Sequence, residues 1–257
     1  MISPNASSSI GRHYTDAGDP QVPVDAAVVI PTVLRPILRR AVQSVFNQDL
    51  KGRIQILIGV DAAASNDHGL DTLLADRPSN ISVTTLMLPY STSVRHGGVH
   101  QATDGGALRT MLSFMANSRY VAYLDDDNEW RADHLSKLLP VLNGKVWAYS
   151  RRMLVHEQTG EELGEDRWDS VGVDRGRFAS TGGFVDPNCL IIDKIRAARA
   201  LGRWSETSTG RPDMTADRNF FFAIRQAPHG EVREATVLYT VRPTNILLRF
   251  MAEGQEF

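Results

Sequence analysis

The chain has a single cysteine, no long apolar run and no excess of charge of either sign. Cys189 cannot form an internal disulfide and has no CxxC or Cys/His partner at zinc-binding spacing, so we expect a reducing, cytoplasmic location. No apolar run approaches the roughly 18–20 residues that span a bilayer, and we expect no transmembrane segment. Residues 1–25 also lack the apolar centre of a signal peptide, which predicts a flexible N-terminal tail.

The net charge and the absence of several sequence motifs exclude further classes of protein. The 28 Lys and Arg nearly balance 30 Asp and Glu, giving a net charge of −2, so we expect no nucleic-acid partner. Neither GxxxxGK(S/T) nor GxGxxG follows the first predicted strand, and neither GxSxG nor HExxH occurs. These absences argue against P-loop NTPases, dinucleotide oxidoreductases, and serine or zinc hydrolases.

What the sequence does contain is an alternation of buried strands and amphipathic helices. Ala26–Pro31 and Ile54–Val60 are continuous apolar runs, rich in β-branched residues, as is typical of parallel strands buried on both faces. Between them, apolar residues at spacings of three and four predict a helix over 34–46. Similar patterns predict strands at 81–86 and 120–124 and helices at 70–75, 107–116 and 134–142.

The second half of the chain is less regular. Strands are expected at 146–150, 190–192 and 236–241, and helices at 194–201 and 217–225. Because no repeat or low-complexity linker divides the chain, we predict a single Rossmann-like α/β domain over 26–257. Its central sheet is mixed and mainly parallel, and residues 26–145 form its nucleotide-binding half.

The strongest chemical signal is Asp125-Asp126-Asp127, at the end of the strand 120–124. Three adjacent carboxylates repel one another, and a divalent cation such as Mg²⁺ or Mn²⁺ offsets that repulsion. The alternative is an acidic turn that caps the next helix. Asp61 follows another buried strand at the same sheet edge, where a carboxylate can bind a base or ribose; an Asx turn is the alternative. Pro31-Thr32 shares that edge.

These segments together resemble the inverting family 2 glycosyltransferases of the GT-A fold. The resemblance covers about residues 26 to 245 and rests on segments in the family's order: 27–32, 39–49, 56–61, Gly105 to Arg109, Tyr120 to Asn128, and Trp130 with Asp133 to Leu135. It implies transfer of a sugar from a nucleotide diphosphate sugar to an acceptor hydroxyl, with inversion at the anomeric carbon. By family frequency we prefer a UDP-sugar, and residues 146–257 become the acceptor-binding half.

The resemblance also assigns roles on the donor side. Thr32 and Asp61 would hold the base, Arg109 the base or diphosphate side, and Asp125 and Asp126 the ribose region. Asp127 would bind Mn²⁺ or Mg²⁺. The family's histidine that can complete the metal shell is missing from the segment 239–245, and His229 is the substitute candidate, with a surface histidine as the alternative.

On the acceptor side, Asp217 matches the family's catalytic base. Its preceding acidic partner is replaced by Ala216, and a helix cap is the alternative role. Asp213 is the runner-up for the base, in a loop rich in Gly, Pro and Thr. Asp186 and Trp204 are further acceptor-side candidates, although Trp204 is equally well explained as buried core.

Two rival functions remain open at this stage. A nucleotidyltransferase has a related sheet, but it carries a Gly-rich basic loop after its first strand, which Ile30 to Leu34 is not. The other rival is a non-catalytic module that binds nucleotide-sugar or carbohydrate. The sequence leaves the acceptor open among a glycan, a lipid-linked glycan and a small molecule. It also leaves open whether the protein forms a homo-oligomer and whether it lies at the inner face of a membrane. An amphipathic segment at 246–251 packs on the core by default, with contact to a partner subunit or to a membrane surface as the alternatives.

Overall fold

The computed structural model describes residues 12–14, 18–61, 70–207, 216–243 and 245–253. The described residues form a ten-stranded mixed sheet in the order β1-β4-β3-β2-β5-β11-β7-β12-β6, with β8 paired to β7. The fold class predicted from the sequence is confirmed. The strands are β1 (Arg12–Tyr14), β2 (Ala26–Thr32), β3 (Ile54–Val60), β4 (Ile81–Met87), β5 (Tyr120–Tyr123), β6 (Glu129–Trp130), β7 (Trp147–His156), β8 (Glu162–Glu165), β11 (Leu190–Asp193) and β12 (His229–Val241).

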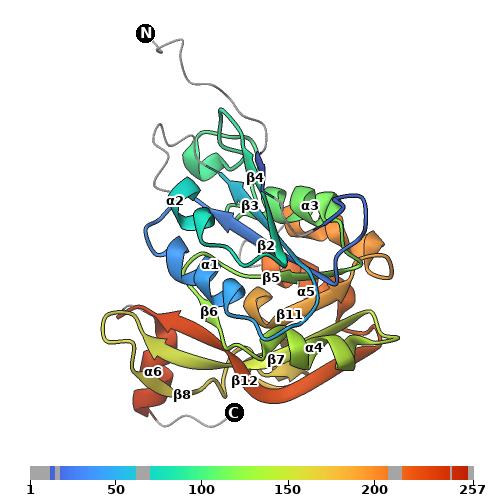
Figure 1. Cartoon of the computed structure of the whole chain (residues 1–257). Helices are drawn as coiled ribbons and strands as arrows, with labels where there is room; N and C mark the ends of the chain where they lie inside the picture. Colours follow the sequence, from blue (N-terminus) through green and yellow to red (C-terminus); the bar gives the residue numbers. More distant parts are fainter. Residues whose placement is uncertain (1–11, 15–17, 62–69, 208–215, 244, 254–257) are drawn as a thin grey trace.

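Helices flank the sheet, with α1 and α2 on one side and α3 and α5 on the other (Figure 1). A small separate pair joins β9 (Gly172–Val173) to β10 (Gly183–Phe184). The α-helices are α1 (Leu38–Phe46), α2 (Leu70–Ala75), α3 (Gly106–Met115), α4 (His134–Leu142), α5 (Ala216–Ile224) and α6 (Ile246–Glu253). Short 3-10 helices are η1 (Val94–His96), η2 (Gly176–Thr181), η3 (Pro187–Cys189) and η4 (Ala198–Ser205).

The N-terminal half is a parallel unit of four strands, β4-β3-β2-β5. All seven residues of β2 and all seven of β3 are buried, which is why they read as continuous apolar runs in the sequence. The chain runs outward from β2 to β3 and β4 and then returns to place β5 on the other side of β2. This reversal leaves a crevice at the carboxyl ends of β2 and β5, where ligands bind in open α/β sheets.

The C-terminal half extends the same sheet. Strand β11 lies antiparallel between β5 and β7, and β12 runs parallel to β7 with irregular register between Glu231 and Val237. The prediction of an α-helix at 194–201 is wrong, because the structure has a 3-10 helix there and that helix begins later. The Asp193 carboxylate accepts the backbone N–H groups of Ile195 and Arg196, which makes a turn there, and the 3-10 helix η4 begins only at Ala198.

The predicted N-terminal tail is partly fixed to the sheet. Strand β1 pairs antiparallel with β4, and Val24 bridges to Ser118. Strand β4 would otherwise present unpaired backbone groups at the sheet edge, and β1 covers them. The expectation of a flexible tail is therefore wrong for residues 12–14 and for the segment around Val24.

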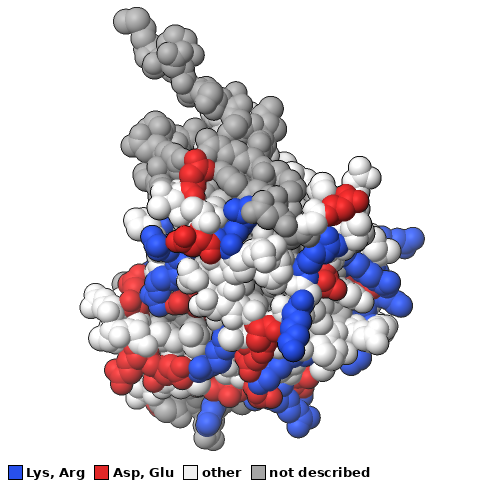
Figure 2. Space-filling view, in the orientation of Figure 1, with Lys and Arg blue, Asp and Glu red and all other residues white. Residues whose placement is uncertain are grey.

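One buried apolar cluster runs through both halves, from Ala26 to Val237. A smaller cluster holds α6 against β7 and β12 through Leu247 and Phe250, the core-packing role that the sequence left open. Among the described residues, no helix combines the length and apolarity needed to cross a membrane. Acidic and basic side chains are mixed over the face drawn in Figure 2.

Candidate active site

A cavity of about 390 Å³ opens at the carboxyl ends of β2, β3 and β5. It lies where the order of the strands reverses, as expected for a ligand site in this class of sheet. Gly105, with φ of 73°, lets the loop before α3 approach Pro31, because a Cβ there would lie 2.8 Å from the Pro31 Cβ. Six residues singled out from the sequence line this cavity: Thr32, Asp61, Arg109, Asp125, Asp126 and Asp127.

Asp61 is buried at the end of β3. Its Oδ1 accepts hydrogen bonds from the Thr92 backbone N–H, at 3.0 Å, and from the Thr92 hydroxyl. Its Oδ2 accepts one from the Ser91 hydroxyl at 3.2 Å. These bonds hold the carboxylate against the loop that follows β4, so the loop and the strand end form one wall of the cavity.

Thr32 links β2 to the aspartate triplet. Its hydroxyl donates to Asp126 Oδ2 at 2.6 Å and accepts the Leu34 backbone N–H at 2.8 Å. Leu34 is held at φ of 60°, a left-handed conformation that costs a non-glycine residue about 1–3 kcal/mol. This strained turn directs the next residue, Arg35, over the triplet.

Arg35 is a site residue that the sequence analysis missed. Its guanidinium binds both oxygens of Asp126 and lies 3.1 Å from Asp127 Oδ2. Arg242, just after β12, reaches the same Oδ2 at 2.9 Å. Burial raises the pKa of Asp127, and repulsion from Asp125 adds to it; the two arginines counteract this. The sequence placed Arg35 within the helix predicted over 34–46, whereas α1 begins only at Leu38 and leaves Arg35 in the turn before it.

Arg109 neutralises the first aspartate of the triplet. It projects from α3, is almost fully buried, and binds both Asp125 Oδ1 and the Asp104 carbonyl oxygen. Its guanidinium also lies 5.4 Å from the centre of the Trp204 ring. Each aspartate of the triplet therefore has an arginine partner.

The triplet fits a metal ion only through Asp127. Asp125 turns toward Arg109 and Asn188, and Asp126 toward Thr32 and Arg35. Within the described ranges, no group of three or more His, Cys, Asp or Glu side chains is arranged to hold a metal. Asp127 remains partly exposed on the cavity wall, and Mg²⁺ is commonly bound by one or two carboxylates together with substrate phosphates. A shared site of that kind fits the residues, whereas a closed protein cage does not.

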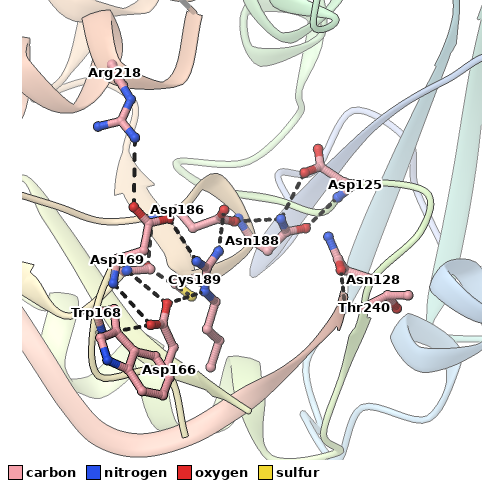
Figure 3. A network of polar contacts seen from close by, with 12 residues as sticks. Asp125, Asn128, Asp166, Trp168, Asp169, Asp186, Asn188, Cys189, Arg218 and Thr240 are labelled. Atoms are coloured by element: carbon pink, nitrogen blue, oxygen red, sulfur yellow. Dashed lines mark hydrogen bonds and ion pairs between the residues drawn. The ribbon is translucent and has the colours of Figure 1, made fainter. Parts of the chain in front are cut away.

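A second cluster of charges, which includes Asp166, Asp169 and Asp186, lies beside Asn188 (Figure 3), and Arg152 of β7 is the common partner of its carboxylates. Arg152 is fully buried and binds Asp166 at 2.8 Å, Asp186 at 2.7 Å and Asp169 at 2.9 Å. Burial raises the pKa of Asp186 to about 6, although Arg152 acts in the opposite direction. The Asn188 amide donates to both Asp186 and Asp125, and it thereby joins this cluster to the cavity.

Asp217 lies in the first turn of α5, half-buried, and its Oδ1 accepts the Arg218 backbone N–H at 2.7 Å. The Arg218 guanidinium lies 3.8 Å from Asp169, so the start of α5 is connected to the Arg152 cluster. Figure 3 places Arg218 on one side of this cluster and Asp125 on the other. Asp213, the runner-up for the base, lies outside the described residues.

Asp217 does not line the cavity, and three further sequence-predicted residues are not brought to it either. Trp204 is buried and stacked on Phe220 at 4.1 Å, so its ring is core and cannot stack on a sugar. Asp186 is buried against Arg152 rather than lining the cavity. His229 stacks on Trp147 at the start of β12, whereas Arg242 follows the strand's other end; a strand of 13 residues spans about 40 Å. His229 therefore does not complete a shell at Asp127.

The mixed, mainly parallel sheet is similar in fold to solved structures that hold UDP or UDP-GlcNAc. No protein-family model matches the chain, and no curated protein matches its sequence. Solved structures of S. aureus TarS do match. TarS 1–349 in complex with UDP-GlcNAc aligns with a TM-score of 0.60 at 13% identity, over 87% of this chain and 60% of that one. The complex with UDP gives 0.59 and 13%, over 89% and 64%. The chain thus spans less than two thirds of TarS 1–349, and the likeness shows the fold.

Proposed function

We propose that this protein is an inverting glycosyltransferase of the GT-A type, similar to family 2, which uses a UDP-sugar as donor. One observation carries the proposal: Asp61, Thr32 and the aspartate triplet line one cavity at the strand ends of a fold shared with TarS, a glycosyltransferase solved with UDP-GlcNAc and with UDP. The nucleotidyltransferase alternative is weaker, because the β2 end carries Pro31-Thr32-Val33 in place of a Gly-rich basic loop.

The donor would lie across the strand ends. Asp61 on β3 offers a carboxylate to a base that presents an N–H group, as uracil does at N3. Strands in a sheet are about 4.8 Å apart, so the triplet after β5 lies two strands and about 10 Å away from Asp61. In this pose the ribose faces Asp125 and Asp126, and the diphosphate lies near Asp127.

The reaction is a single displacement. The acceptor hydroxyl oxygen attacks the anomeric carbon, the bond from that carbon to the diphosphate oxygen breaks, and the diphosphate leaves with the electron pair. The Asp217 carboxylate takes the acceptor's proton, since base assistance raises the nucleophilicity of the hydroxyl as it attacks. A Mn²⁺ or Mg²⁺ ion held by Asp127 and the donor's phosphates would stabilise the charge on the leaving group.

The acceptor, a glycan, lipid-linked glycan or small molecule, would enter from the side of α5. We propose a cytoplasmic location for the protein, with contact at the inner face of a membrane if the acceptor is lipid-linked. No acceptor is assigned more narrowly, so the test begins from the donor.

The first test is calorimetric titration with UDP, GDP, CDP and dTDP, each with and without Mn²⁺. We expect tightest binding of UDP and a further gain with Mn²⁺. UDP release from UDP-sugars, with a panel of glycan acceptors, then measures transfer. Asp217→Asn is expected to keep UDP binding and lose transfer by a factor of at least 100. Asp71→Asn, the same change in the first turn of α2, is the matched control and should leave both unchanged.

Three outcomes would count against the proposal. A folded protein that binds none of the four nucleotides contradicts a nucleotide-sugar donor. Wild-type protein that binds UDP-sugars but transfers to no acceptor and to no water supports the binding-module alternative. Transfer by Asp217→Asn at near the wild-type rate shows that the base is another residue.

A further inference from the structure

We propose that Arg35 and Arg242 bind the donor's diphosphate directly, and that they supply positive charge there independently of a metal ion. This inference rests on the proposed function. It concerns two arginines that come from opposite ends of the chain and meet at one oxygen, Asp127 Oδ2.

The charges of the aspartate triplet are balanced by arginines. Three aspartates without partners at the strand ends would repel a nucleoside diphosphate. Arg35, Arg109 and Arg242 carry charge equal and opposite to that of the triplet, so the triplet is neutralised before any ligand or metal binds. An anionic ligand can therefore approach the triplet without strong repulsion from it.

Arg35 and Arg242 are far more exposed than Arg109. The side chains of Arg35 and Arg242 are 36% and 51% exposed, whereas that of Arg109 is 5% exposed. Arg109 is fixed by Asp125 and a backbone carbonyl, but the other two can exchange a carboxylate for a phosphate with little loss of packing. The contacts of Arg35 with Asp126 and Asp127 leave further N–H groups of its guanidinium for a ligand.

Arg35 is placed where it can reach a bound diphosphate. Arg35 lines the cavity and follows the strained Leu34 turn, which fixes its backbone beside Thr32. Asp127, its partner, lies on the side of the cavity away from Asp61, where the diphosphate of a donor lies if Asp61 holds the base. A planar guanidinium matches two phosphate oxygens at once, which is the geometry that arginine recognises best.

The experiment compares UDP with uridine in the presence of EDTA. Uridine carries the base and ribose but no phosphate, so the ratio of the two dissociation constants isolates the diphosphate contacts. Calorimetry gives the UDP value, and displacement of UDP by uridine gives the other. We expect wild-type protein to prefer UDP at least tenfold without metal. Arg35→Gln and Arg242→Gln should each lower this ratio about tenfold, because each variant loses the charged hydrogen-bond donors that face the diphosphate.

Uridine binding serves as the internal check of folding, because a misfolded variant loses both ligands. Arg40→Gln is the matched control: Arg40 lies on α1, is 44% exposed and pairs with Glu129 outside the cavity. It should leave the ratio unchanged. Arg35→Lys keeps the positive charge but not the planar guanidinium, so it should retain part of the preference for UDP over uridine.

The outcomes separate this inference from the proposed function. If wild-type protein binds UDP only when Mn²⁺ is present, and the glutamine variants match it, the arginine proposal is overturned while the donor assignment stands. If the variants lose uridine and UDP equally yet remain folded, the arginines shape the base site and the proposal is again wrong. If wild-type protein binds neither ligand with or without Mn²⁺, the proposed function itself fails.

Discussion

The protein has two clusters of charged side chains joined by Asn188, and they are balanced in opposite ways. At the cavity, three aspartates meet three arginines, and several of these side chains are partly exposed. In the second cluster one buried arginine, Arg152, forms ion pairs with Asp166, Asp169 and Asp186. In the first cluster, Arg35 and Arg242 are exposed enough to exchange a carboxylate for a ligand. In the second, Arg152 is fully buried, and Asp166 would remain in a poorly solvated site if it lost Arg152.

The cavity cluster is suited to binding a ligand, and the Arg152 cluster is suited to stabilising the fold. Pairs near solvent contribute little to stability and can rearrange around a ligand, whereas removing one partner of a buried pair is strongly destabilising. Tyr239 packs over the fully buried Arg152 guanidinium at 3.9 Å. We therefore expect substitutions in the Arg152 cluster to change the free energy of unfolding and substitutions at the cavity to change affinity.

The largest effect is expected for Arg152→Met. Removing the guanidinium leaves three carboxylates without their common partner, and breaking a buried ion pair costs about 3–5 kcal/mol. Urea denaturation at pH 7 measures the loss. Arg151→Met is the control, since Arg151 is the neighbouring residue but pairs with Glu165 and Glu231 nearer the surface. It should cost about 1 kcal/mol or less. Equal losses for the two variants would show that the comparison between buried and exposed clusters is mistaken.

His134 tests burial without a compensating charge. It is fully buried at the start of α4, stacks on Trp130 at 4.1 Å, and its Nδ1 lies 2.7 Å from the Thr236 hydroxyl. Burial lowers the pKa of His134 to about 3. The unfolded chain takes up the proton near pH 6.5 and the folded chain does not, so stability is lost as the pH falls from about 6.5 toward 3.

The substitution His134→Phe removes this titration and keeps a ring against Trp130. Between pH 7 and pH 4.5, wild-type protein should lose about 2–3 kcal/mol more stability than the variant, which corresponds to two pH units below the unfolded pKa. Denaturation curves at both pH values measure the difference, in which the effects of the carboxylates cancel. Parallel loss in the two proteins would place the acid sensitivity elsewhere.

Much of the cavity's framework could be predicted from sequence. Strands β2 and β3 are buried on both faces, so their composition alone marks them, and parallel strands bring the residues at their carboxyl ends together. That rule placed Thr32, Asp61 and the aspartate triplet at one edge. Their roles toward a donor or a metal stay predictions.

The residues that were missed depend on tertiary contacts. Arg35 and Arg242 are about 200 positions apart and belong to no apolar pattern, so their meeting at Asp127 follows only from the path of β12. Arg151 and Arg152 are adjacent, and alternation along β7 turns one outward and buries the other. Trp204 lies in a polar-looking segment, and its burial is decided by Tyr123 and Phe220, which pack on its ring.

Thr32→Val is the smallest and most selective test of the comparison. Valine has the shape of threonine but leaves Asp126 with one partner fewer and the Leu34 N–H without its acceptor. We expect a loss of about 1–2 kcal/mol in unfolding free energy, well below that of Arg152→Met. Because the hydroxyl also anchors the turn that directs Arg35, the ratio of UDP to uridine affinity in EDTA should fall severalfold. Thr110→Val, which removes only a bond to the Leu201 carbonyl, is the control and should leave this ratio unchanged. A variant of Thr32 with reduced stability but an unchanged ratio would mean that Arg35 reaches the diphosphate without help from the Leu34 turn.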